Sequence, residues 1–296
     1  MTSEPTVSVV MPAYNHAEFI VEAIESVLAQ DFGDLELMVS DDGSSDDTVA
    51  RARSLRDPRL HVIDNGMNRG AAVVHNELVA RARGRYVAVI NSDDAWTPGK
   101  LSKQVAFLES HPDVWACFGR ARFVARGGAD IPKESLHFGG VFDAENRSRG
   151  AWLRHFFLRG NCLCHPTALL RREVYARLGP YDTRLRQLPD FDMWVRLVKL
   201  SAFHIFPDEF IRFRILPGEN ASSATSANSA RIYNEHYFIA RRFFDGATAD
   251  LLREGFSDLL IHPELPTPEH LDIEKAFLFL QPIPGIGPMY LSLIHI

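Results

Sequence analysis

The chain has 296 residues, of which 46% are hydrophobic, and a formal net charge of −6 at pH 7. This length can bury a sizeable core in one large domain or two closely joined ones, so bulk stability needs neither disulfides nor metals. The acidic balance argues against a nucleic-acid partner, because phosphate neutralisation needs a basic surface. Three cysteines are too few for a disulfide framework and fit a reducing cytosol.

The first hundred residues alternate between short β-branched runs and segments with helical spacing of apolar residues. The pattern predicts strands at 7–11, 35–40, 59–65 and 85–91, and helices at 19–28, 49–57, 70–84 and 98–108. This order predicts an α/β fold with a mainly parallel sheet and helices on both faces. "PAYN", "DDGS" and "NSDD" each follow a strand, at the sheet edge where such folds bind ligands.

From Val114 onward the pattern is mixed. Strands are predicted at 114–119, 121–125, 202–206 and 209–215, helices at 151–158, 190–201 and 230–244, and a strand entering a helix within 167–182. The segment 216–230 is rich in Ser, Asn, Ala and Gly, which predicts a flexible loop or linker.

The two ends of the chain bear on membrane contact. The first residues contain no basic segment followed by a long apolar stretch, so we expect no secretory signal. Residues 276–296 contain no Asp, Glu, Lys or Arg, but three prolines and two glycines interrupt them. We therefore expect an apolar tail that packs on the domain or lies at a membrane surface, rather than a spanning helix.

Two of the strand-end loops carry side chains suited to a nucleotide. "MPAYN" offers a fixed backbone at Pro12 and a ring at Tyr14 on which a base can stack, although this signal is weak alone. In "DDGSSDDT", Asp41 and Asp42 can accept hydrogen bonds from a base imide and a ribose hydroxyl. The alternative is that these acids only shape the turn and cap the next helix, which explains one or two of four acids in seven positions.

The third loop, "NSDD", predicts a cation site. Mg²⁺ and Mn²⁺ prefer oxygen ligands, and one or two carboxylates with phosphate oxygens and water suffice for Mg²⁺. One of Asp93 and Asp94 can hold the cation while the other binds ribose, although Asn91 stands where a third acid would strengthen the site. A helix cap is the alternative, but Thr97 is better placed for it.

"PDFDMWVRL" carries the remaining acids. Asp190 and Asp192 are two positions apart on a predicted helix, so they point in different directions and do not form a glycosidase pair. One acid facing the sheet edge can act as a general base, while Trp194 packs or lines a sugar pocket. A helix cap is an equal alternative for Asp190. "CLCH" (162–165) has no second pair of zinc ligands, so buried strand residues are expected there.

Taken together and in this order, "MPAYN", "DDGSSDDT", "NRG…HN", "NSDDAWTPGKL" and "PDFDMWVRL" resemble the inverting family-two glycosyltransferases of GT-A fold, over roughly residues 5–215. The resemblance implies transfer of a sugar from a nucleotide diphosphate donor, usually UDP-linked, to a hydroxyl of a glycan or lipid-linked acceptor. It implies a GT-A domain at 1–220, with a nucleotide-binding half at 1–110 and an acceptor-binding half at 111–220. A linker with a helical and apolar extension is then expected at 221–296.

The resemblance also assigns roles by position. It implies Asp190 as the catalytic base and Asp94 as the ligand of a divalent cation, Mn²⁺ or Mg²⁺, across the diphosphate. Contacts with the nucleotide sugar are expected from Pro12, Ala13, Tyr14, Asp41, Asp42, Gly70, Asn76, Ser92 and Asp93. Acceptor or phosphate contacts are expected from Asn91, His165, Trp194 and Arg214.

The sequence departs from the family's pattern at several positions. Asn91 replaces the first acid of the Asp-X-Asp pattern, and Pro189 stands where many relatives have Glu. His75 replaces a common Arg, and Ile215 and Leu216 occupy a loop that in many relatives offers a His to the cation.

Two rival functions follow from these features. A sugar-1-phosphate nucleotidyltransferase is disfavoured, because "PAYNHAEF" has no Gly, Lys or Arg to form a phosphate loop. A non-catalytic protein that binds a nucleotide or glycan is the stronger alternative, because the loop His is missing; Asp94 and Asp190 count against it. We expect a cytoplasmic enzyme of polysaccharide and cell-envelope synthesis, with peripheral contact at the inner membrane face through the C-terminal segment.

Overall fold

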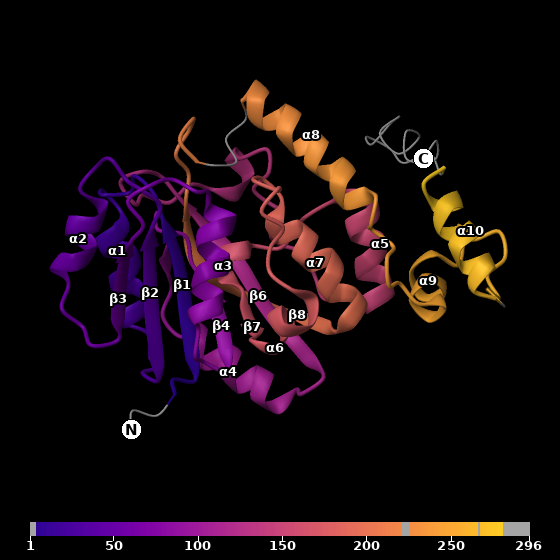
Figure 1. Cartoon of the computed structure of the whole chain (residues 1–296), viewed down its shortest axis with the longest axis horizontal. Helices are drawn as coiled ribbons and strands as arrows, with labels where there is room; N and C mark the ends of the chain where they lie inside the picture. The colour runs from indigo at the N-terminus through magenta and orange to yellow at the C-terminus, as the bar shows by residue number, and fades with distance from the viewer. Residues whose placement is uncertain (1–3, 221–224, 266, 281–296) are drawn as a thin grey trace. The chain divides into compact units, whose positions relative to one another are not determined.

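The computed structural model describes residues 4–220, 225–265 and 267–280. Its centre is an eight-stranded sheet in the order β3-β2-β1-β4-β7-β6-β8-β5 (Figure 1). The strands are β1 (Val7–Ala13), β2 (Leu35–Asp41), β3 (Leu60–Asp64), β4 (Tyr86–Val89), β5 (Ala95–Trp96), β6 (Val114–Val124), β7 (Leu169–Arg171) and β8 (Ala202–Arg214). The α-helices are α1 (Ile20–Leu28), α2 (Thr48–Ser54), α3 (Ala71–Arg81), α4 (Lys100–Ser110), α5 (Arg149–Arg159), α6 (Glu173–Leu178), α7 (Pro189–Leu200), α8 (Ser226–Ala240), α9 (Ala249–Phe256) and α10 (Pro268–Leu278). Two 3₁₀ helices are η1 (Lys133–Ser135) and η2 (His165–Thr167).

The sheet has a parallel part and an antiparallel part. β3, β2, β1 and β4 pair in parallel, whereas β7 pairs antiparallel with β4 and β6, and β5 pairs antiparallel with β8. The predicted α/β class is therefore confirmed, and the parallel pairing belongs to the part of the chain where strand and helix alternate. Strand order reverses between β1 and β4, and such a reversal opens a crevice at the carboxyl ends of the strands.

Burial follows the predicted patterns in this part of the chain. β1 and β2 are buried along almost their whole length, as expected for central strands covered on both faces. In α1 the buried residues are Ile20, Ala23, Ile24 and Val27, which form one stripe of the helix. Gly84 is required where the chain enters β4, because an added Cβ would lie 2.5 Å from the backbone nitrogen of Ser8.

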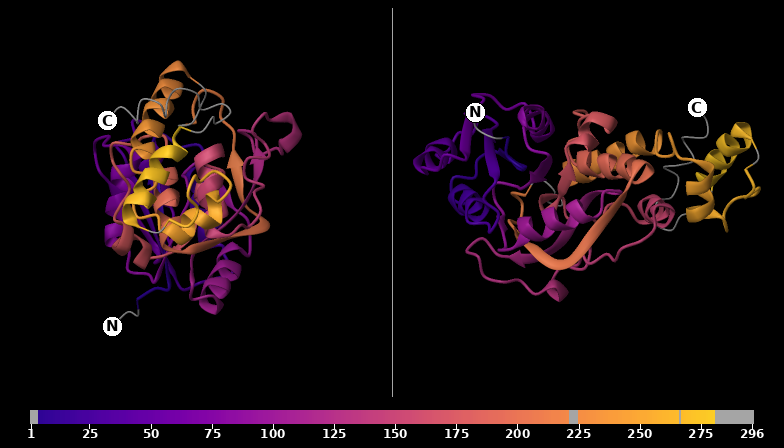
Figure 2. Two further views of the ribbon diagram at one scale, coloured as in Figure 1. Left: turned by 90° about the vertical axis from the view of Figure 1, so that its right-hand side faces the viewer. Right: turned by 90° about the horizontal axis from the view of Figure 1, so that it is seen from below.

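The second half of the sheet differs from the prediction. β6 and β8 are each one continuous strand where two were expected, and Figure 2 shows β8 as a long curved strand. Gly119 lies within β6 and is the place where this strand accommodates Phe210, since a Cβ there would lie 2.3 Å from the Phe210 ring. The predicted loop at 216–230 is also too long, because α8 begins at Ser226. β5 was not predicted, and α9 and α10 lie in the expected helical extension, although their individual bounds were not predicted.

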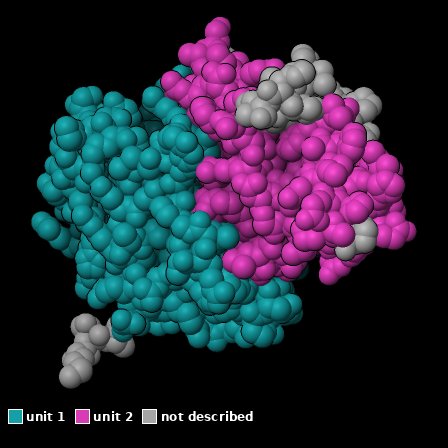
Figure 3. All heavy atoms as spheres, turned by 45° about the vertical axis from the view of Figure 1, so that its right-hand side comes forward, with its two compact units in different colours: residues 1–145, 162–186, 203–223 teal, residues 146–161, 187–202, 224–296 magenta. Residues whose placement is uncertain are grey.

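The chain packs into two compact units. One compact unit comprises residues 1–145, 162–186 and 203–223, and the other comprises 146–161, 187–202 and 224–296 (Figure 3). The sheet lies in the first unit, apart from the first residue of β8. In the second unit α5 contacts both α7 and α9, so the C-terminal helices share a core with the helix that carries Asp190.

The apolar C-terminal segment lies largely outside the described residues, which end at Leu280. Within the described parts of the chain, no helix combines the length and apolarity that crossing a bilayer requires.

Candidate active site

The loops after β1 and β2 are held together by Asn15. Its backbone nitrogen donates to Ser44 Oγ at 2.8 Å, and its Oδ1 accepts from the backbone nitrogen of Ser45 at 2.8 Å. Asn15 has a positive φ of 52°, which turns the chain away from the strand. The neighbouring Tyr14 is 45% exposed. A large ring is thus presented at the carboxyl edge of the sheet, as a base-stacking role requires.

The acids of "DDGSSDDT" make more internal contacts than the sequence suggested. Asp41 accepts from the backbone nitrogen of Ser44, and Asp46 accepts from the backbone nitrogens of Ala17 and Thr48. Asp42 accepts from the backbone nitrogens of Arg69 at 2.7 Å and Gly70 at 2.9 Å. A turn-shaping role therefore explains three of the four acids. These same contacts bring the predicted residues Asp41, Asp42 and Gly70 together.

The "NSDD" loop forms a buried pair of carboxylates. Asp94 Oδ1 accepts from the backbone nitrogen of Arg214 at 2.8 Å, and Oδ2 accepts from Asn91 Nδ2 at 3.0 Å. Asp93 Oδ2 accepts from Asn220 Nδ2 at 3.2 Å. Asp94 is only 2% exposed and Asp93 7%. Asn91 therefore orients Asp94 through a donor that an acid at this position would lack.

Both carboxylates are difficult to ionise in this setting. Burial, and then the charge of Asp93, hold the pKa of Asp94 well above its usual range. Burial likewise raises the pKa of Asp93, against the charges of His16 and Arg214. Two desolvated oxygen ligands that repel one another suit an added divalent cation, which would relieve both costs. The described residues contain no cluster of three or more His, Cys, Asp or Glu side chains able to hold a metal.

Arg214 is a structural clamp beside this pair rather than an exposed phosphate contact. Its guanidinium donates to Glu22, to the backbone oxygen of Asp93 and to two further backbone oxygens in the turn after β6. The side chain is almost fully buried. The Arg214 guanidinium, expected to contact phosphate, is therefore already hydrogen-bonded to groups of the protein.

Asn220 is a site residue that the sequence analysis missed. It bonds to Asp93, and its Oδ1 accepts from the backbone nitrogen of Leu216 at 2.6 Å. The loop without the family's His therefore still contacts the acid pair, through an amide five residues after Ile215. Its polarity in a loop following a strand was the only local signal.

His16 is a second missed residue. Its Nδ1 lies 2.7 Å from Ser92 Oγ, and its backbone nitrogen donates to Thr48 Oγ1. His16 thus joins all three strand-end loops. It directly follows "PAYN", so its position at a strand end was the available signal.

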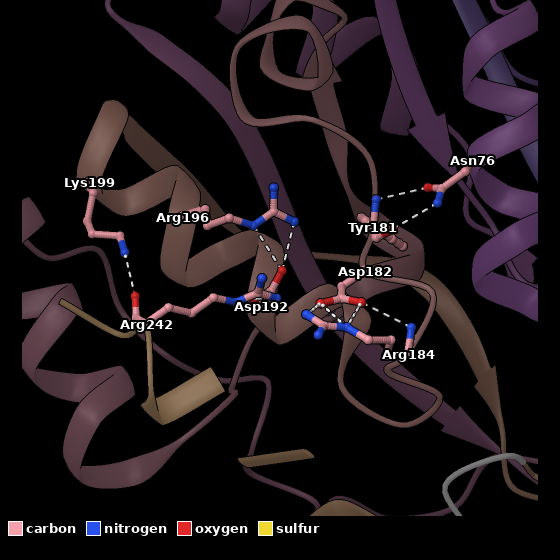
Figure 4. Close-up of polar contacts among 8 residues, drawn as sticks. All are labelled: Asn76, Tyr181, Asp182, Arg184, Asp192, Arg196, Lys199 and Arg242. Atoms are coloured by element: carbon pink, nitrogen blue, oxygen red, sulfur yellow. Dashed lines mark hydrogen bonds and ion pairs between the residues drawn. The ribbon is translucent and has the colours of Figure 1, made fainter. Parts of the chain in front are cut away.

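A group of rings surrounds the predicted residues Asn76 and His165. The side chain of Asn76 makes two hydrogen bonds of 2.9 Å with the backbone of Tyr181 (Figure 4) and so holds the loop after α6 in place. His75 stacks on Tyr181 with centroids 4.2 Å apart, and His165 Nε2 lies 2.9 Å from the Tyr181 hydroxyl. Burial holds the pKa of His75 well below its usual value. A neutral His75 does not replace the charge of the family's Arg.

The two acids of α7, in the second unit, have different partners. Asp190 Oδ2 accepts from Asn161 Nδ2 at 2.8 Å. Asp192 is buried and ion-paired with both Arg196 and Arg242 (Figure 4). The structure therefore distinguishes the two acids: Asp192 stabilises the fold, and Asp190 is held by a neutral donor.

Two other predictions are decided by burial. Trp194 is fully buried on a helix that also buries most of its other side chains, which favours the packing interpretation over the expected acceptor contact. Cys162 and Cys164 are buried, as expected for "CLCH", but they lie in the loop between α5 and η2 and not in a strand.

A cavity of about 1050 Å³ lies near the amino ends of β1 and β4. It is lined by Thr6, Arg83, Arg85 and Arg172 among others, and Asn76 is the only predicted site residue in its wall. The cavity is at the sheet edge opposite to the acid pair. We therefore assign the candidate site to the carboxyl edge of the sheet, where the three strand-end loops bring their acids and Tyr14 together.

Comparison with known proteins gives one family and several relatives. Residues 8–179 match the family described as "Glycosyl transferase family 2". The Escherichia coli enzyme WfaP, named as a UDP-Glc:α-D-GlcNAc-diphosphoundecaprenol β-1,3-glucosyltransferase, is 38% identical over 104 residues, covering 35% of this chain and 41% of WfaP.

Solved structures that share the fold include a TarS complex and a mannosyltransferase. S. aureus TarS (1–349) in complex with UDP-GlcNAc superimposes with a TM-score of 0.67 at 19% identity, over 97% of this chain and 79% of TarS. The mannosyltransferase PcManGT of Pyrobaculum calidifontis, in complex with GDP-Man and Mn²⁺, gives 0.55 at 19% identity, over 99% and 74% of the two chains.

Proposed function

The chain belongs to glycosyl transferase family 2, and from this premise we propose that it moves a sugar from a UDP-linked donor to a hydroxyl of a glycan or lipid-linked acceptor, with inversion. The observation that carries the proposal is the junction of three strand-end loops at the switch point of the sheet. There an exposed Tyr14 stands beside loops whose acids are fixed by internal hydrogen bonds. A preorganised edge of this kind fits a nucleotide diphosphate.

The donor is proposed as UDP-linked on two of the three named relatives, since PcManGT has been solved with GDP-Man. WfaP is named for UDP-Glc, and TarS has been solved with UDP-GlcNAc. In this chain Tyr14 would stack on the base, while Asp41 and Asp42 would contact base and ribose. Since both acids already accept backbone hydrogen bonds, their oxygens are oriented before the donor binds.

A divalent cation, Mn²⁺ or Mg²⁺, would be held by Asp94 with Asp93 beside it. When bound, it would offset negative charge on the diphosphate leaving group. The raised pKa of both carboxylates supports this assignment, because burial of the pair outweighs the nearby charges of His16 and Arg214. Asn91 and the backbone of Arg214 orient Asp94 and leave each of its oxygens a second lone pair.

Asp190 is proposed as the general base. It would take the proton of the acceptor hydroxyl, whose oxygen then attacks the anomeric carbon on the side opposite to the leaving UDP, which inverts that centre. The matched family segment ends at residue 179, so this role rests on the motif around Asp190 and on its contacts. An aspartate held by a neutral amide keeps an oxygen able to accept a proton.

A panel of nucleotide sugars tests the proposal by thermal shift, with and without Mn²⁺. A donor that binds only the folded state should raise the melting temperature. At 100 times its Kd the donor adds about 2.7 kcal/mol to the free energy of unfolding. We expect a UDP-sugar to give the largest shift. Absence of response to every donor would overturn the proposal, and binding without hydrolysis or transfer would identify a non-catalytic binding protein instead.

A further inference from the structure

We infer that Asn161 and Glu235 are positioning residues for Asp190, and that helix α8 is therefore part of the catalytic support rather than an appendage. The inference rests on the proposed function, in which Asp190 is the base. Asn161 lies in the turn after α5, and Glu235 lies on α8, beyond the matched family segment. Both belong to the same compact unit as Asp190.

Asn161 reaches Asp190 because of the way α5 ends. Gly160 closes the helix with its backbone nitrogen on Phe156 O and has a φ of +79°, which only glycine adopts readily. The next side chain then donates from Nδ2 to Asp190 Oδ2 at 2.8 Å. This neutral donor fixes the direction in which the carboxylate of Asp190 points.

Glu235 fixes the start of the helix that carries Asp190. Leu188, the residue preceding α7, makes no side-chain cap, and Pro189 at the first helical position has no N–H to satisfy. Glu235 Oε2 accepts from the backbone nitrogens of both Gln187 and Leu188 at 2.8 Å. A buried carboxylate from a distant helix thus fixes the backbone of the two residues that precede α7, close to Asp190.

The residue after Glu235 also contacts this turn. His236 packs its ring against Phe191, with centroids 5.7 Å apart. Two consecutive residues of α8 therefore contact the residues on either side of Asp190. A small displacement of a reacting group can reduce a rate by about 100-fold, so loss of either contact should appear in turnover.

Glu274 offers a matched control. Like Glu235 it is a buried glutamate of the same unit, and it accepts from two consecutive backbone nitrogens, those of Ile261 and His262. Glu274→Gln therefore imposes the same chemical change and a comparable cost in stability, at a place that supports the α9 to α10 connection.

The test measures kcat, the acceptor KM, UDP affinity and melting temperature for Asn161→Ala, Glu235→Gln and Glu274→Gln. We expect kcat to fall roughly 10-fold to 100-fold in the first two variants, with UDP affinity within about twofold of the parent. Glu274→Gln should lower the melting temperature as much as Glu235→Gln does and keep kcat. If Glu235→Gln fails to fold, Asn161→Ala, at a less buried position, still decides the inference.

The Asp190→Asn background separates this inference from the proposed function. With the base removed, neither Asn161→Ala nor Glu235→Gln should lower turnover further, because residues that act through one group are not additive. Normal turnover of Asp190→Asn alone would overturn the role of the base and with it the proposed mechanism. A large loss in Asp190→Asn, with kcat unchanged in Asn161→Ala and Glu235→Gln, would overturn only the positioning role.

Discussion

Two pairs of aspartates in this chain have opposite electrostatic surroundings. Asp93 and Asp94 are adjacent and buried, and the partners of their carboxylates are amides and a backbone nitrogen. Asp192 is equally buried but has two arginine partners, while Asp190 is held by one amide. The first pair therefore lacks a direct counter-charge, and Asp192 has its counter-charge built into the fold.

This difference shows that the partners of an aspartate decide its role. A buried carboxylate with internal cations is stable as an ion and can only stabilise the structure. A buried pair without them favours a cation or proton from outside. An aspartate with a neutral partner remains able to accept a proton. The predictions below change one side of this comparison at a time.

The largest effect is expected from Asp190→Asn. Removing the general base should lower transfer by at least about 100-fold, the range of such groups. The amide keeps the shape of the side chain, so UDP affinity and melting temperature should change little. Steady-state transfer and UDP titration measure the two quantities, and unchanged transfer would remove Asp190 from the mechanism.

Asp192→Asn should show the reverse pattern, with lower stability. The change leaves Arg196 and Arg242 without their shared carboxylate. Because both arginines are partly exposed, we expect a loss of about 2–3 kcal/mol, below the value for a fully buried pair. Denaturant unfolding measures this loss. Asp272→Asn, which removes an exposed ion pair with Lys275, is the control and should cost under about 0.5 kcal/mol.

Asp94→Asn should abolish the stabilisation by Mn²⁺. In the parent protein with UDP, Mn²⁺ at ten times its Kd should add about 1.4 kcal/mol. The variant should lose this shift, while its stability without Mn²⁺ should fall less than that of Asp192→Asn, because one of two repelling charges is gone. Asp192→Asn should retain the Mn²⁺ shift. A full shift in Asp94→Asn would place the cation elsewhere.

Lys100 should make stability depend on pH. Its buried ammonium donates to Gln104 and lies 3.9 Å from the centroid of the Trp96 ring, and burial lowers the pKa of Lys100 to about 7. Above pH 7 the unfolded chain keeps a proton that the folded chain releases, so the free energy of unfolding should rise with pH.

The expected rise from Lys100 is about 1 kcal/mol between pH 7 and 8, relative to Lys100→Met. Lys199 in the other unit, whose pKa burial lowers to about 8, should begin to contribute one pH unit higher. Urea unfolding across pH 6 to 9 measures both trends. A constant difference between the parent and Lys100→Met would show that Lys100 does not titrate in this range.

Much of the fold could be predicted because its first half has local signals. Alternating strand and helix patterns gave β1 to β4 with their helices, and the strand-end loops followed from that order. β6 and β8 were each predicted as two strands, but each is continuous, and Phe210 of β8 packs into the gap that Gly119 leaves in β6. No local pattern indicates which distant strand or helix fills such a gap.

The contacts that assign roles in the site were out of reach for the same reason. Asp94 meets the backbone of Arg214 across 120 positions, and Glu235 meets Leu188 across 47. The sequence could place Asp94 and Asp190 by their motifs, but the partners that distinguish Asp190 from Asp192 come from α5 and α8. Side-chain type predicts what a residue can do, and its distant partners decide what it does.

The smallest effect on turnover is expected from Asn91→Asp. The amide of Asn91 now donates to Asp94, and an acid there would add a third carboxylate to the pair. Without Mn²⁺ this variant should be less stable than the parent, because like charges meet in a buried loop. With Mn²⁺ the added oxygen can serve as a ligand, so the Mn²⁺ concentration that gives half-saturation should fall. Turnover at saturating Mn²⁺ should stay within about threefold of the parent, a change of less than about 1 kcal/mol in the activation free energy. Asn91→Ala, which removes the donor without adding a charge, should not tighten Mn²⁺ binding. Weaker Mn²⁺ binding by Asn91→Asp, measured by thermal shift, would place Asn91 away from the cation and leave it only the task of orienting Asp94.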